Sequence, residues 1–152
     1  MVYAESSIAG QPGSDMTFQT LEGRNLTIFE LRNSVILLNF WGTWCRPCLE
    51  EIPDLIKLSH RFQSQGLHVI GVTLESGSPD DIRTFTKTHG MDYIVVIGDL
   101  DEVKLKFQVM GFPASVLIDR EGIVRKRYFG PQTEAGLAKD VLPLLSSSKL
   151  HD

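Results

Sequence analysis

The chain has 152 residues, of which 42% are hydrophobic, and a formal net charge of -4. This length and hydrophobic content suit a single domain with one core. The basic residues are scattered, which argues against a nucleic-acid-binding protein, because such proteins cluster positive charge. No apolar stretch approaches the roughly 20 residues that cross a bilayer.

Residues 1–15 lack the basic start and apolar centre of a secretory signal, so we expect a flexible leader. If the natural protein is exported, its signal or membrane anchor has been trimmed from this sequence. Thr17 to Leu21 and Leu26 to Phe29 predict two strands joined by a turn at Gly23, and hence an N-terminal hairpin. The apolar run from Ser34 to Phe40 is typical of a strand covered on both faces.

From Cys45 onward, apolar residues recur at three- and four-residue spacing and predict a long helix that begins at the cysteines and ends before Gly66. We count Glu50 and Glu51 among its polar positions. The next run, Leu67 to Leu74, predicts a second buried strand. Strand, helix and strand then form a βαβ unit with a parallel strand pair.

The second half of the chain continues to alternate between helices and strands. Ser78 and Pro79 predict the N-cap and first residue of a helix that Gly90 stops. The later expected elements are a strand over 93–97, a short helix over 101–107, an antiparallel hairpin of 114–118 and 123–129, and a helix over 133–145. We therefore expect one domain over residues 16–146, and a flexible tail over 147–152.

The two cysteines of the chain, Cys45 and Cys48, form a CxxC motif directly behind the first apolar run. A disulfide between them closes too short a loop to act as a structural staple. It can, however, open and close by exchange with another thiol or disulfide. Because a helix N-terminus favours a thiolate, we interpret Cys45 as the attacking nucleophile and Cys48 as the resolving cysteine. Arg46 adds positive charge beside them, Pro47 stiffens the ring, and we expect both residues to contact the substrate.

Three features together resemble the thioredoxin superfamily over about residues 16–146. They are the run NFWGTWCRPC, Pro53 in the following helix, and Gly111-Phe112-Pro113-Ala114 before a strand. The resemblance implies an α/β thioredoxin fold, with a mixed central sheet flanked by helices. The N-terminal hairpin and the segment from Pro79 to Ile97, inserted after the second core strand, resemble the TlpA-like group. That group comprises extracytoplasmic, usually membrane-tethered thiol/disulfide oxidoreductases, many of which keep cysteines reduced during cytochrome c maturation.

The same resemblance implies a substrate-binding rim beside the cysteines. Pro113 would follow a cis peptide bond and lie against the CxxC pair, which exposes the backbone of Phe112 to a substrate chain. Phe112 would also offer an apolar contact. Of the two tryptophans, we expect Trp41 to pack inside and Trp44 to lie at the surface near the substrate.

The handling of the resolving cysteine's proton needs a separate residue in this chain. In thioredoxin an acid occupies the position of Asn39, and an amide cannot replace it in proton transfer. In the TlpA-like group a glutamate after the second core strand is thought to take this role, and Glu75 in the run VTLES fits that position. We therefore predict Glu75 as the proton handler, with a pKa raised by burial near its target.

These features predict a thiol/disulfide oxidoreductase that reduces disulfides of other proteins. The expected substrate is apocytochrome c or a similar exported partner. We expect an upstream thiol protein as electron donor, a monomer, an extracytoplasmic location, and neither cofactor nor metal. Two alternatives stay open. One is a copper-binding carrier that uses the two thiolates, with Met110 as weak evidence for a third ligand. The other is a peroxide-reducing enzyme of the related antioxidant family, which places a threonine three residues before its nucleophile, whereas Thr43 lies two before Cys45.

Overall fold

The computed structural model describes residues 10, 12–13 and 15–147. Its strands form one mixed sheet in the order β2-β1-β5-β4-β3-β6-β7. The strands are β1 (Thr17–Thr20), β2 (Asn25–Thr27), β3 (Val35–Trp41), β4 (Leu67–Thr73), β5 (Ile94–Ile97), β6 (Ala114–Ile118) and β7 (Val124–Phe129). The helices are α2 (Arg46–Phe62), α3 (Pro79–Thr88), α4 (Leu100–Phe107) and α5 (Glu134–Ser147). The predicted α/β class with a mixed sheet is confirmed.

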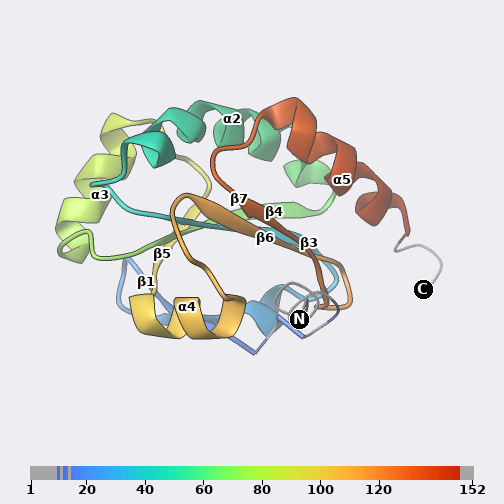
Figure 1. Cartoon of the computed structure of the whole chain (residues 1–152), viewed down its shortest axis with the longest axis horizontal. Coiled ribbons are helices and arrows are strands. Elements are labelled where there is room, and N and C mark those ends of the chain that lie inside the picture. Colours follow the sequence, from blue (N-terminus) through green and yellow to red (C-terminus); the bar gives the residue numbers. More distant parts are fainter. Residues whose placement is uncertain (1–9, 11, 14, 148–152) are drawn as a thin grey trace.

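Helices cover both faces of the sheet. Helices α2, α3 and α5 lie on one face and α4 on the other (Figure 1). The sheet separates two apolar clusters, one packed under α2 and α5 and the other under α4. Strand β4 runs parallel to β3 and β5, so β3, α2 and β4 form the predicted βαβ unit.

Strand β3 is central to the sheet, and all seven of its residues are buried. Its apolar side chains alternate between the two clusters, as the pleat of a strand requires. Val35, Leu37 and Trp41 join the cluster under α2, whereas Ile36, Leu38 and Phe40 join the cluster on the α4 side. Asn39 therefore faces α2 from within an apolar surface. The strand ends at Trp41, four residues before Cys45.

The predicted N-terminal hairpin is present, because β1 pairs with β2 in antiparallel register. The second strand is shorter than predicted, and Ile28–Leu31 forms a 3-10 helix instead. The Thr27 N–H donates to the carboxylate of Glu30 at 3.0 Å, a bond that favours a helical turn over an extended strand. The prediction of a strand to Phe29 is wrong for this local reason.

Part of the segment predicted as a leader contacts the sheet. The Gly10 N–H donates to the Val124 carbonyl at 2.7 Å, and Pro12 forms a bridge with Ile123. The rest of the predicted leader before residue 10, and the tail after residue 147, lie outside the described residues. Within the described part of the chain, no helix is long and apolar enough to cross a membrane.

Candidate active site

Cys45 and Cys48 are joined by a disulfide at the start of α2, with Cα atoms 5.3 Å apart. Cys45 is the N-cap of the helix, and its Sγ accepts the N–H of Cys48 at 3.3 Å. The helix begins at the cysteines, as the sequence predicts. In the reduced protein, this N–H and the helix dipole favour a negative charge on the Cys45 sulfur.

Burial differs between the residues of the motif. Cys45 is 6% exposed and Cys48 is 2% exposed, so the cysteine predicted as the resolving one is the less accessible. Arg46 and Pro47 lie between them and are exposed. Arg46 pairs with Glu50, with Nε and Oε2 3.4 Å apart. A pair this exposed contributes little to stability. The exposed part of the motif is therefore Arg46 and Pro47, between two buried cysteines.

The predicted rim lies beside the end of β3. The peptide bond between Phe112 and Pro113 is cis, as the resemblance implies. Ala114 pairs with Phe40 in the register of β3 and β6, which brings Pro113 to the end of β3 that leads into the CxxC motif. The Trp44 ring packs edge-on against the Phe112 ring, with centroids 5.7 Å apart. Trp44, predicted at the surface, is 53% exposed.

Glu75 does not have the burial on which its predicted role depends. It follows β4 at Leu74, adopts a left-handed backbone conformation with φ of 49°, and its side chain is exposed. The role of Glu75 in proton transfer stays a prediction.

A different carboxyl is buried under the disulfide. Glu51 is 2% exposed and lies three residues after Cys48, on the same face of α2. Its interpretation as one of the polar positions of the helix is wrong. The spacing could have shown this, because Glu51 lies between Cys48 and Leu55 on the apolar stripe. A carboxyl on such a stripe is either paired or protonated.

Two hydrogen bonds hold the Glu51 carboxyl. Asn39 Nδ2 donates to Oε1 at 2.9 Å, and the Gln132 N–H donates to Oε2 at 2.8 Å. Asn39 Nδ2 also lies 3.0 Å from Ser115 Oγ, which fixes the amide between β3 and β6. Burial raises the pKa of Glu51 to about 7, an effect that the two donors oppose and the nearby charge of Asp54 reinforces. The amide that replaces the acid of thioredoxin thus holds an acid supplied by α2.

Tyr93 is a buried phenol in the same apolar cluster as Cys48. Burial, followed by the charges of Glu51 and Asp92, raises the pKa of Tyr93 well above its ordinary value. Its hydroxyl is buried and has no hydrogen-bond partner among the described residues. The Tyr93 ring lies over Gly71, at the position where a Cβ would also meet Trp41 Nε1 at 2.9 Å. This cluster adjoins the carboxyl of Glu51 on the α2 face of the sheet.

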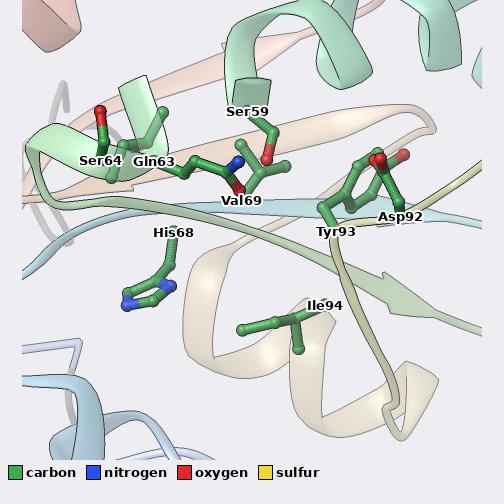
Figure 2. Close-up of a pocket in the computed structure, with 9 residues that line it drawn as sticks. Ser59, Gln63, Ser64, His68, Val69, Asp92, Tyr93 and Ile94 are labelled. Carbon is green, nitrogen blue, oxygen red and sulfur yellow. The ribbon is translucent and has the colours of Figure 1, made fainter. Parts of the chain in front are cut away.

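A surface cavity of about 340 Å³ lies away from the disulfide. Figure 2 shows Ser59, Val69 and Tyr93 on the α2 side of the sheet, with His68 and Ile94 pointing to the other side. The cavity lies at the start of β4, where β5 has not yet begun. Neither cysteine lines it. The CxxC pair therefore lies outside this cavity.

Few side chains near the cysteines support the alternative of a copper-binding site. Among residues 10, 12–13 and 15–147, no group of three or more His, Cys, Asp or Glu side chains is placed to hold a metal ion. Met110, the suggested third ligand, is 87% exposed. The two sulfurs thus remain the soft ligands that such a site would use.

The geometry above is that of a dithiol redox centre on a thioredoxin-like sheet, and the comparisons with known proteins agree. Residues 9–127 match the model of the AhpC/TSA family. The chain belongs to the AhpC/TSA family.

Relatives of this family member are named for redox chemistry. It is 33% identical over 126 residues to the thiol-disulfide oxidoreductase ResA of Geobacillus thermodenitrificans, covering 82% of this chain and 71% of the relative. It is 30% identical over 131 residues to ResA of Bacillus subtilis, covering 86% and 73%. A crystal structure of a thiol:disulfide interchange protein of the thioredoxin family from Chlorobium tepidum superposes with a TM-score of 0.77 at 26% identity, covering 89% of this chain and 96% of the other. This family member is a thiol/disulfide oxidoreductase with a thioredoxin fold, as the sequence predicts.

Proposed function

We propose that this oxidoreductase reduces disulfides of exported proteins, with apocytochrome c or a similar partner as substrate. The observation that carries the proposal is the pairing of an N-cap cysteine with a buried carboxyl one helical turn further inside α2. The first group supplies a nucleophile, and the second can accept a proton at neutral pH. The accessible rim of Trp44 and Phe112 suits a peptide chain.

The reaction consists of two exchange steps. The Cys45 thiolate attacks one sulfur of the substrate disulfide, so a mixed disulfide forms and the other substrate sulfur leaves as a thiolate. The Cys48 thiolate then attacks Cys45 Sγ, which closes the Cys45–Cys48 disulfide and releases the second substrate thiolate. Two electrons pass to the substrate, and both of its cysteines end as thiols after taking up protons.

The second step requires a buried thiol to lose its proton. Cys48 is 2% exposed, and burial in apolar surroundings disfavours its thiolate. Glu51 follows on the same helix face and, with a pKa of about 7, is ionised in about half of the molecules at neutral pH. We assign it the role of accepting the Cys48 proton. Glu75, whose exposed carboxyl faces solvent, is the competing assignment that mutagenesis must separate from it.

The direction of electron flow depends on a reduction potential. A value near about -270 mV for the Cys45/Cys48 pair is expected for a reductase, whereas about -120 mV would indicate an oxidant and contradict the proposal. An extracytoplasmic location and an upstream thiol protein as donor follow from the same resemblance to the TlpA-like group. Both belong to the proposal.

The decisive experiment uses a peptide with a disulfide between two cysteines spaced as CxxC. The reduced wild-type protein should open this disulfide. Cys48→Ala should stop at a mixed disulfide that mass spectrometry detects, whereas Cys45→Ala, the matched control, should form none. Capture by Cys45→Ala instead would reverse the assignment of nucleophile and resolving cysteine. Copper retained through dialysis without peptide reduction, or hydrogen peroxide consumed in preference to the peptide, would favour the two alternatives.

A further inference from the structure

Trp44 is exposed over half of its surface, yet its indole is held in place. Its Nε1 donates to the Leu74 carbonyl at 3.0 Å, and its ring meets Phe112 at an interplanar angle of 90°. Leu74 lies directly after β4, and its N–H donates to the Trp41 carbonyl at 2.9 Å. The indole is therefore tied to the sheet, and the part that stays exposed lies beside Cys45.

Ser76 connects the same carbonyl to the CxxC loop. Its hydroxyl donates to the Leu74 carbonyl at 3.0 Å and accepts the N–H of Thr43, also at 3.0 Å. The left-handed backbone conformation of Glu75 turns the chain. The Ser76 hydroxyl thereby reaches the carbonyl of Leu74, two residues before it. The Leu74 carbonyl therefore binds the indole of Trp44, and the Ser76 hydroxyl binds the backbone of Thr43.

Gly42 leaves the space that the indole occupies. A Cβ at this position would collide with Trp44 Nε1 and Cε2. Gly42 is not among the described glycines with positive φ, so its backbone conformation is open to other residues. Because Gly42 has no side chain, the Trp44 ring can pack closely against its backbone. A single methyl group added at this position would displace the ring.

We propose that Gly42, the Leu74 carbonyl and Ser76 form a clip that holds the Trp44 indole as a fixed apolar wall, and that this wall selects substrates with an apolar side chain next to the cysteine attacked by Cys45. The selection rests on the proposed function, whereas the clip itself does not. A rigid aromatic ring loses little conformational entropy when a partner binds. Phe112 supplies the adjoining surface. In this clip Ser76 is a positioning residue, and Trp44 contacts the substrate.

The clip is tested by nuclear magnetic resonance of the oxidised protein. The chain has two tryptophans, so two indole N–H signals are expected, and that of buried Trp41 serves as an internal reference. Gly42→Ala and Ser76→Ala should each shift the Trp44 signal and speed its exchange with solvent. Ser76→Thr should restore the wild-type position because it keeps the hydroxyl. Unchanged Trp44 signals in both variants would overturn the clip.

The matched control is Ser78→Ala. The Ser78 hydroxyl accepts the Asp81 N–H as the N-cap of α3 and, within the described part of the chain, makes no hydrogen bond to residues 42–48. This variant loses a helix cap two residues beyond Ser76 and should leave the Trp44 signal in place. A Trp44 shift in Ser78→Ala as large as in Ser76→Ala would show a general loosening of the segment and contradict a specific clip.

Selection is tested with two disulfide peptides of equal length, carrying Leu or Ser next to the target cysteine. The second-order rate constant of a single turnover should favour the Leu peptide, and this ratio should fall on the order of tenfold in Gly42→Ala and Ser76→Ala. An unchanged ratio in variants whose indole has moved would refute selection by Trp44. If the wild type reduces neither peptide, the proposed function and the selection both fail, and the magnetic resonance result still decides the clip.

Discussion

Replacing Glu51 with Gln should remove a large pH dependence from the stability of the oxidised protein. Burial lifts the pKa of this carboxyl from its ordinary 4.5 to about 7. Because the folded state binds the proton more tightly than the unfolded state, stability is fully present below about pH 4.5 and is lost as the pH rises through about 7. At about 1.4 kcal/mol for each pKa unit, the loss is about 3 kcal/mol.

The assay is urea unfolding of the oxidised wild type and of Glu51→Gln between pH 4.5 and 8.5. The difference between their unfolding free energies should change by about 3 kcal/mol across this range, since other groups contribute equally to both. Gln keeps one acceptor oxygen but replaces the other with an amide, so it mismatches one of the two donors, Asn39 Nδ2 or the Gln132 N–H. A constant offset between the two curves is therefore expected in addition.

Glu50→Gln is the matched control. This neighbouring carboxyl belongs to the same helix, but its side chain is 64% exposed and forms an ion pair with exposed Arg46. Its curve should run parallel to that of the wild type. Parallel curves for Glu51→Gln would refute the reasoning, because they would show that Glu51 does not keep its proton at neutral pH.

Two further predictions concern side-chain hydrogen bonds in the rest of the fold. Tyr93→Phe removes a buried hydroxyl that has no hydrogen-bond partner among the described residues, and it should change the unfolding free energy by less than about 1 kcal/mol. Tyr128→Phe breaks a 2.7 Å hydrogen bond to Asp140 and should lower the unfolding free energy by about 1 kcal/mol. Equal losses in the two variants would contradict this prediction. Arg120→Met should lower the unfolding free energy by about 3 kcal/mol in thermal or urea unfolding, because the guanidinium donates to three backbone carbonyls. A loss below about 1 kcal/mol would contradict this and show that water replaces the guanidinium as donor to these carbonyls. Those carbonyls belong to Asn33, Gln65 and Leu145.

Most of the elements could be predicted because their signals are local. The apolar run of β3, the helical spacing after Cys45 and the Ser78 N-cap each lie within one element. The parallel pairing of β3 with β4 follows from the helix between them. The error at Phe29 also has a local cause, since Thr27 and Glu30 form a hydrogen-bonded turn that β-propensity does not reveal.

The candidate proton handler could not be chosen in the same way. Glu51 lies three residues after Cys48 and Glu75 lies after the next strand, and a helical stripe shows only that Glu51 shares a face with Cys48. The burial that raises its pKa, and the two donors that oppose this rise, come from distant segments. The donors are Asn39 on β3 and Gln132 before α5, 12 and 81 residues away. Such partners meet only when the chain has folded.

The sequence by itself determined the chemistry of the protein, because two cysteines at the start of an amphipathic helix place a nucleophile and its resolving partner within one turn. Tertiary structure alone decided their surroundings. It buried Glu51 under the motif, left Glu75 in solvent, and tied Trp44 to Leu74 and Ser76. The physical reason is that periodicity assigns side chains to a face, whereas burial and hydrogen bonding depend on what distant segments place against that face.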